Sequence, residues 1–131
     1  MAIVRTTNKR GLDANNRPAW CGVTAAGIFR VHRGGRRFDC HYHDYNEYWL
    51  VFKGKAKIRS EEVEFYVKAG DIVCTKAGDE HDVLEVYEDF EAFFFEEAGP
   101  ADARIGHLHR DAEKAAGHPV PALPLPADFP E

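Results

Sequence analysis

Short apolar or alternating segments run through the middle of the chain, and glycine or charged residues separate them. The segments comprise residues 27–32, 38–43, 47–52, 56–59, 63–67, 71–75, 83–87 and 90–95. Segments of this length, with turn residues between them, are typical of β-strands. The last segment is rich in phenylalanine, which predicts that both of its faces are covered. We therefore predict an all-β protein whose short strands form a sandwich or a barrel.

Glycine marks the expected turns between these strands. Four dipeptides contain a glycine that tolerates positive φ: Gly34-Gly35, Lys53-Gly54, Ala69-Gly70 and Ala77-Gly78. We expect a turn at each of them.

The two ends of the chain depart from this pattern. Residues 1–24 carry turn formers without a sustained period, and we expect an irregular N-terminal arm that packs on a barrel of residues 25–99. Residues 100–131 are expected to form a short helix, which ends at Gly117, and then an extended proline-rich tail. The apolar side chains of this tail should lie on protein surface. We expect the whole chain to be one domain.

Composition and charge narrow the possible partners and location. The 131 residues are 44% hydrophobic and 30% charged, as in globular proteins, and the net charge of −5 disfavours nucleic acid and membranes as partners. Residues 1–10 hold no apolar run of signal-peptide length, and no later stretch has the apolar length of a membrane span. The cysteines Cys21, Cys40 and Cys74 are an odd set without paired spacing, which predicts free thiols in a reducing compartment. The sequence therefore predicts a cytoplasmic protein.

A group of histidines and one glutamate offers metal-binding chemistry. His41 and His43 point to the same face if they lie on a strand, Glu47 follows four residues later, and His81 comes just after a turn. Three imidazoles and one carboxylate suit iron, manganese, nickel, cobalt, copper or zinc, whereas calcium prefers oxygen ligands. Cys40 would face the opposite side from His41.

The spacing of these residues within a frame of glycines resembles the two motifs of the cupin family. The first motif, G(X)5HXH(X)3E(X)6G, fits without departure and comprises Gly35, His41, His43, Glu47 and Gly54. The second, G(X)5PXG(X)2H(X)3N, fits at Gly70, Gly78 and His81, but Lys76 replaces its proline and Glu85 its asparagine. The resemblance covers roughly residues 25–96.

This resemblance implies a small single-domain cupin with a double-stranded β-helix, or jelly-roll, barrel. It further implies one divalent transition metal held by His41, His43, Glu47 and His81, and a homodimer, for which residues 1–25 are the expected contact. Cupins include dioxygenases, sugar and keto isomerases, epimerases, lyases and decarboxylases. We expect a metal-dependent enzyme that acts on a small oxygen-bearing molecule, with dioxygenase and isomerase chemistry both open. The alternative is a non-catalytic module that binds or senses a metal or a small ligand.

Residues near the motifs are candidates for the pocket. Alternation from Glu47 points Trp49 and Val51 inward, and Trp49 is a candidate pocket wall, as are Tyr42 and Tyr45 in the ligand loop. Glu47 is also the candidate catalytic base, because a carboxylate that partly leaves a metal can take a proton.

For other charged and titratable residues the sequence gives weaker evidence of a functional role. Arg36 and Arg37 either draw an anionic substrate or form a solvated pair, and the second interpretation is preferred. His107 and His109 repeat the His-x-His spacing without a carboxylate or a glycine frame, and we expect both to be exposed on the helical segment.

Overall fold

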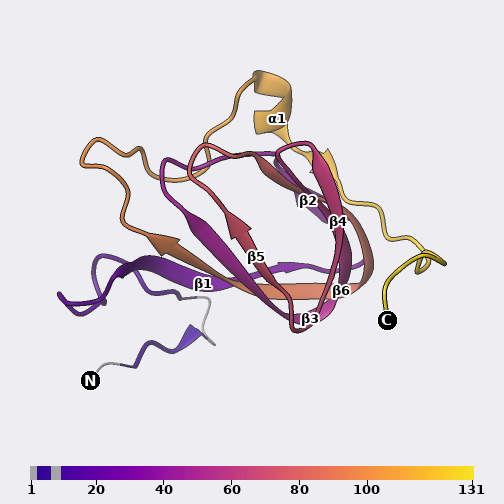
Figure 1. Ribbon diagram of the computed structural model, residues 1–131, viewed down its shortest axis with the longest axis horizontal. Helices are drawn as coiled ribbons and strands as arrows, with labels where there is room; N and C mark the ends of the chain where they lie inside the picture. The colour runs from indigo at the N-terminus through magenta and orange to yellow at the C-terminus, as the bar shows by residue number, and fades with distance from the viewer. Residues whose placement is uncertain (1–2, 7–9) are drawn as a thin grey trace.

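The computed structural model describes residues 3–6 and 10–131, and it consists almost entirely of β-strands (Figure 1). The elements are β1 (Val23–Val31), β2 (Arg37–Phe38), β3 (Glu47–Ser60), β4 (Val63–Lys68), β5 (Ile72–Thr75), β6 (His81–Glu97), α1 (Ala112–Ala116) and β7 (His118–Pro119). The prediction of an all-β protein is confirmed. The single helix in the described part of the chain has five residues, far fewer than a membrane-spanning helix needs.

Two long strands, β3 and β6, form the frame of the molecule. They pair with each other in antiparallel order, β1 extends the sheet beyond β6, and β5 and β4 pair with the first and second halves of β3. Each long strand joins two segments that the sequence predicted as separate. The break expected at Lys53-Gly54 is therefore wrong: Gly54, with φ of 87°, lies inside β3.

Gly54 is required because the two long strands approach closely at this point. A Cβ atom at position 54 would meet the carbonyl oxygen of Asp89 in β6 at 2.0 Å. The pairing of β3 with β6 also shifts register on both sides of position 54, as at a β-bulge. The glycine thus bends a continuous strand and does not end one.

The other expected turns are present. Gly34, Gly35, Gly70 and Gly78 all have positive φ and lie between strands. A further turn, between β3 and β4, uses two residues with positive φ, Glu61 (45°) and Glu62 (69°). Sequence analysis missed it because such two-residue turns normally contain glycine or asparagine.

The predicted strand at 38–43 is wrong as a continuous element, because its residues change partners. Phe38 pairs with β7, His41 with His81 at the start of β6, and Tyr42 with Leu108. Over these few residues the backbone therefore pairs with three different segments of the chain. This path brings the first His-x-His pair against the C-terminal segment.

The C-terminal segment is less helical than expected. A helix was expected over 100–116, but only Ala112–Ala116 is helical; it begins at the N-cap Asp111 and ends at Gly117, as predicted. Residues 106–109 are excluded from the helix because Gly106 has φ of 88° and Leu108 exchanges two backbone hydrogen bonds with Tyr42. The segment that was expected to be helical is thus held as an extended strap.

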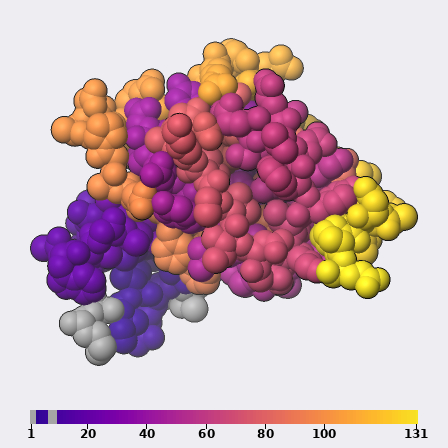
Figure 2. All heavy atoms as spheres, viewed as in Figure 1, coloured from indigo at the N-terminus to yellow at the C-terminus, as the bar shows by residue number. Residues whose placement is uncertain are grey.

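The two ends of the chain lie on opposite sides of the molecule (Figure 2). In the tail, Val120 and Phe129 are buried, whereas Leu123 and Leu125 stay partly exposed. In the predicted N-terminal arm, Leu12 exchanges two backbone hydrogen bonds with Ala26 of β1. Residues 1–2 and 7–9 of that arm lie outside the described residues. The predicted domain limits and the dimer contact remain predictions.

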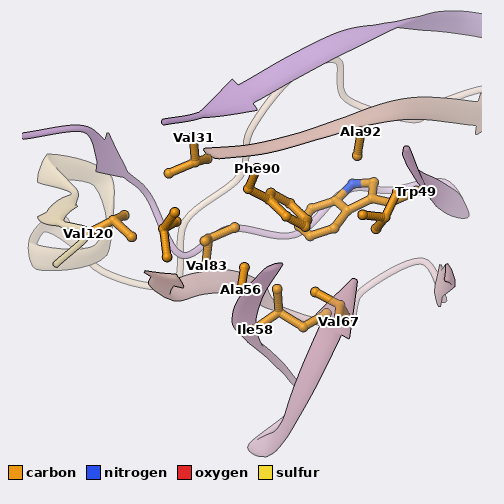
Figure 3. Close-up of a cluster of buried hydrophobic side chains, with 11 residues drawn as sticks. Val31, Trp49, Ala56, Ile58, Val67, Val83, Phe90, Ala92 and Val120 are labelled. Atoms are coloured by element: carbon orange, nitrogen blue, oxygen red, sulfur yellow. The ribbon is translucent and has the colours of Figure 1, made fainter. Parts of the chain in front are cut away.

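The hydrophobic core is formed by side chains of β1, β3, β4 and β6, which come together in the interior (Figure 3). Its central side chains, Ile58, Val83 and Phe90, have at most 1% of their surface exposed. Val120 of the tail packs into the same cluster, and Trp49 closes the cluster on the side of the candidate site. The core thus gives rigid support to one wall of that site.

Candidate metal centre

The four predicted ligands are brought together in the interior. Glu47 is the first residue of β3, His81 is the first residue of β6, and His41 and His43 precede β3. Each has between 1% and 5% of its surface exposed. Two backbone hydrogen bonds, of 3.2 and 2.8 Å, join His41 to His81, and the rings of these two residues lie 4.2 Å apart at their centroids. We call these four residues the inner site.

Backbone carbonyls orient two of the imidazoles. Nδ1 of His41 lies 2.6 Å from the carbonyl oxygen of Asp39, and Nδ1 of His43 lies 2.9 Å from that of Gly106. A carbonyl oxygen only accepts, so each Nδ1 carries the proton and each Nε2 presents a lone pair. This is the arrangement by which proteins fix a histidine ring for metal binding through Nε2.

Glu47 faces the remaining histidine nitrogens. One carboxylate oxygen lies 3.2 Å from Nε2 of His43 and the other lies 3.3 Å from Nε2 of His81. Trp49 holds the carboxylate in place, because its indole N–H donates a hydrogen bond to Glu47 Oε1 over 2.8 Å. Donor atoms of His43, Glu47 and His81 lie within 4.8 Å of one another.

The electrostatics of the inner site favour a cation between these groups. Burial raises the pKa of Glu47, but the close imidazoles of His43 and His81 outweigh it and hold that pKa well below its usual range. Burial, together with the nearby His81 and His107, lowers the pKa of His41 to about 3, so this ring is neutral at physiological pH. The inner site therefore offers one carboxylate and, at His41, a neutral imidazole.

Unpartnered buried atoms test whether a metal fits. Nε2 of His43 and both ring nitrogens of His81 are buried without a hydrogen-bond partner among the described residues. Such atoms cost free energy unless something satisfies them. A divalent transition metal would satisfy the nitrogens that face Glu47, and nitrogen with carboxylate oxygen is the donor set that such ions take. The residues present thus fit a metal, and its binding remains a proposal.

A small cavity of about 120 Å³ opens beside the inner site. It is lined by Phe29, Phe38, His41, Glu47, Trp49, Phe94, Glu96 and His107. Four of these side chains are large aromatic groups, and no lysine or arginine of the described residues is among them. The walls are thus apolar except on the side that carries the inner site.

The predicted pocket residues have different positions. Trp49 is both a wall of the cavity and part of the core, and Val51 points inward as alternation predicted. Tyr45 stacks on His43 with 4.9 Å between ring centroids, and Tyr42 lies against the guanidinium groups of Arg104 and Arg110. Neither tyrosine is among the lining residues.

The arginines and the cysteine next to the first motif stay out of the site. Arg36 and Arg37 are exposed, and Arg37 donates to the carbonyl of Gly117 over 2.9 Å. Cys40 contacts Glu80 at 3.5 Å, away from the inner site, and burial raises the pKa of its thiol to about 11. Glu85, at the position where the family motif has asparagine, accepts a hydrogen bond from Tyr87 and does not line the cavity.

Sequence analysis missed Glu96. It lies opposite Glu47 in the β3–β6 pairing and lines the cavity. Burial, and then the neighbouring Glu47, raise the pKa of Glu96 to about 7. The predicted strand ended at residue 95, and only the register between β3 and β6 reveals that residue 96 belongs to the site.

His107 was assigned incorrectly. It does not lie on a helix; its ring stacks on His41 at a centroid distance of 3.6 Å and lines the cavity. About half of its side chain (51%) is exposed, so the expectation of exposure holds only in part. The repeated His-x-His spacing was the signal that could have found it.

Comparisons with known proteins agree with this geometry. A family model described as a cupin domain (Cupin_2) matches residues 27–96, which is more than half of the chain. The uncharacterized protein y4oW of Sinorhizobium fredii is 38% identical over 71 residues, which make up 54% of this chain and 33% of that protein. The chain thus spans only about a third of the length of this relative.

Several solved structures share the fold. DMSP lyase DddQ from Ruegeria pomeroyi has a TM-score of 0.58 at 19% identity, over 69% of this chain and 44% of that one. An uncharacterized conserved protein with a double-stranded β-helix domain from Klebsiella pneumoniae has a TM-score of 0.54 at 20% identity, over 82% and 91%. At these identities the likeness shows the fold alone, and it confirms the predicted jelly-roll. With the family match over residues 27–96, it follows that the chain belongs to the cupin family.

Proposed function

We propose that this cupin binds one divalent transition metal at the inner site and acts on a small, uncharged, oxygen-bearing molecule in the adjoining cavity. The observation that carries the proposal is the burial of His43, Glu47 and His81 with their donor atoms close together, and with histidine nitrogens that have no hydrogen-bond partner in the described part of the chain. His41 completes the set from the adjoining wall, with its Nδ1 proton already used by a carbonyl.

The cavity supports a narrow class of substrate. Its volume of about 120 Å³ is well below the roughly 300 Å³ at which pockets for drug-sized ligands begin. No basic side chain of the described residues lines it, and the carboxylates Glu47 and Glu96 do. A phosphate or carboxylate on the substrate would be buried without a cationic partner, which costs much free energy. We therefore infer an uncharged diketone, hydroxyketone or phenol as the substrate class.

The residues of the chain have separate roles in this proposal. A metal bound here would polarise a substrate oxygen as a Lewis acid, or support redox chemistry with dioxygen if it is redox-active. Phe29, Phe38 and Phe94 exclude water and orient the apolar part of the substrate. Trp49 holds Glu47 through its indole N–H, and Glu47 is the candidate group for taking a proton from the substrate. Dioxygenase and isomerase chemistry both fit this arrangement.

Substrate assays with defined metals test the proposal. Protein without a histidine tag is loaded with Fe²⁺, Mn²⁺, Ni²⁺ or Zn²⁺, and oxygen uptake and isomerisation are measured with diketones, hydroxyketones and phenols. We expect turnover with an uncharged compound that is at least about tenfold faster than with its carboxylated analogue. The variant His43→Gln/His81→Gln should lose this turnover. The control His32→Gln, which changes a histidine outside the site, should keep it.

The outcomes separate this proposal from its alternative. Saturable binding of the uncharged compounds without turnover would indicate a non-catalytic ligand-binding module. Equal activity in the wild type and in His43→Gln/His81→Gln would contradict any role of the inner site. To test Glu47 itself, Glu47→Gln is compared at matched metal content, and unchanged turnover would remove this residue from proton transfer.

A further inference from the structure

A second group of potential ligands lies just outside the inner site. Asp39, His107 and His109 bring one carboxylate oxygen and two imidazole nitrogens within 4.8 Å of one another. We call these three residues the outer cluster. We propose that the outer cluster is a second metal site, which takes a divalent transition ion such as zinc or copper.

Both imidazole nitrogens face the same carboxylate oxygen. Nδ1 of His107 lies 2.8 Å and Nε2 of His109 lies 2.6 Å from the same oxygen, Oδ2 of Asp39. Ligands at the usual distance of about 2.1 Å from a transition metal lie about 3 Å apart when they occupy adjacent octahedral positions. The two observed nitrogen–oxygen distances are somewhat shorter than this, so the side chains would move apart as a metal takes the place of the two N–H protons.

The strap that carries both histidines is fixed at three points. Leu108, between them, exchanges backbone hydrogen bonds of 2.9 and 3.0 Å with Tyr42. Before them, Arg104 makes a two-pronged ion pair with Asp44, at 2.8 and 3.0 Å. After them, Arg110 donates to the carbonyl of Gly78 over 2.9 Å. The extended backbone at Leu108 places the imidazoles of His107 and His109 on one side of the strap. Because the strap is already fixed, its backbone loses little conformational entropy when a metal binds.

The outer cluster is accessible in a way that the inner site is not. The exposed fractions of the side chains of Asp39, His107 and His109 are 25%, 51% and 21%. The ligand residues of the inner site have at most 5% exposed. A metal can therefore reach the outer cluster directly from solvent, and three protein ligands leave further coordination positions for water.

The donor set indicates which ions fit. Two imidazoles and one carboxylate suit borderline ions such as zinc, copper, nickel or iron, whereas calcium and magnesium require more oxygen ligands. None of the three ligands of the outer cluster belongs to the inner site, but the two groups are neighbours. The rings of His41 and His107 stack, the Asp39 carboxylate lies 3.4 Å from Nδ1 of His41, and His107 offers a nitrogen within 4.8 Å of nitrogens of His41 and His43.

Zinc titration tests the proposal. Untagged protein is freed of metal with a chelator and titrated with Zn²⁺ in a calorimeter, and we expect two classes of binding site. His109→Gln should weaken the outer class by at least about tenfold and leave the inner class unchanged, and Asp39→Asn, made separately, should weaken the outer class by at least as much. Asparagine keeps the backbone carbonyl that orients His41, and the ring of His109 lies 6.4 Å from that of His41. His43→Gln/His81→Gln should remove only the inner class.

Controls make each outcome decisive. His32→Gln should retain both classes, and circular dichroism with thermal melting checks that each variant is folded. Should Asp39→Asn fail to fold, His109→Gln alone and the Co²⁺ absorption spectrum of the wild type give the same test, with two successive sets of visible bands expected. A wild type with one class of site, or a second class that persists in both Asp39→Asn and His109→Gln, would overturn the proposal.

Discussion

Two His-x-His pairs in this chain lie side by side and have very different surroundings. His41 and His43 are buried, with 2% and 3% of their surface exposed, whereas the side chains of His107 and His109 are 51% and 21% exposed. The central residues of the two pairs, Tyr42 and Leu108, are joined by backbone hydrogen bonds. In both pairs the extended backbone directs the imidazoles to one side.

The difference between the pairs is in their partners. His43 faces a carboxylate four residues away, Glu47, which an aromatic wall isolates from solvent. His107 and His109 share Asp39, which comes from a distant part of the chain. Identical spacing therefore produces a buried site in one case and a partly exposed one in the other. The His-x-His spacing does not reveal how deeply the histidines are buried, although this burial affects how strongly they hold a cation.

The largest effect is expected from the loss of an inner ligand. His81→Gln should weaken metal binding at the inner site by more than about 100-fold, since even the loss of residues that only orient ligands costs 10- to 100-fold. Competition with a chelating dye would measure it. His109→Gln is the matched variant in the other pair and should leave this affinity unchanged; equal losses in both would show that the two pairs act as one site.

A smaller loss is expected from the residue that supports Glu47. Trp49→Phe removes the indole N–H that donates to Glu47 and keeps an aromatic ring in the wall. We expect the affinity of the inner site for metal to fall by about 10- to 100-fold, with binding at the outer cluster unchanged. The same chelator competition would measure it, and an unaltered inner affinity would show that the indole does not orient the carboxylate.

A further imidazole–carboxylate contact, between His118 and Asp82, predicts a pH effect on stability. His118 Nε2 lies 2.6 Å from the buried Asp82, and Arg59 lies on the other side of that carboxylate. Burial lowers the pKa of His118, but Asp82 and the carbonyl of Pro119 outweigh it and raise that pKa above its usual range.

The stabilisation by His118 should therefore be complete below the unfolded-state pKa of about 6.5 and lost as the pH rises through the raised folded-state pKa. We expect His118→Gln to lower the free energy of unfolding by about 1 kcal/mol near pH 5.5, after allowance for solvent screening, and by less near pH 9. Urea unfolding of both proteins at the two pH values would measure this. A difference that grows with pH would contradict the assignment.

The smallest effect concerns the strap. Asp44→Asn breaks the ion pair with Arg104, whose side chain is 61% exposed, so the free energy of unfolding should change little. Zinc binding at the outer cluster should weaken a few-fold, because the strap loses one of its three fixed points, and binding at the inner site should not change. Zinc calorimetry would measure both, and a larger loss at the inner site would contradict the separation of the two pairs.

The sequence predicts local features well and long-range ones poorly. The common orientation of His41 and His43 and the inward position of Trp49 follow from the period of two in extended chain, and the structure agrees with them. The position of Glu96 depends on the register of β6 against β3, and that of His107 on a strap that returns from another part of the chain. Gly54 was expected in a turn because its positive φ is predictable, whereas the close approach of Asp89 is not.

Anomalous X-ray diffraction from crystals of untagged, zinc-loaded protein, recorded at the zinc absorption edge, is the most direct test of the inner site. A strong anomalous peak among the side chains of His41, His43, Glu47 and His81 is the predicted result. Well-ordered side chains at these positions without a peak between them would contradict the account, even if zinc were bound elsewhere on the molecule.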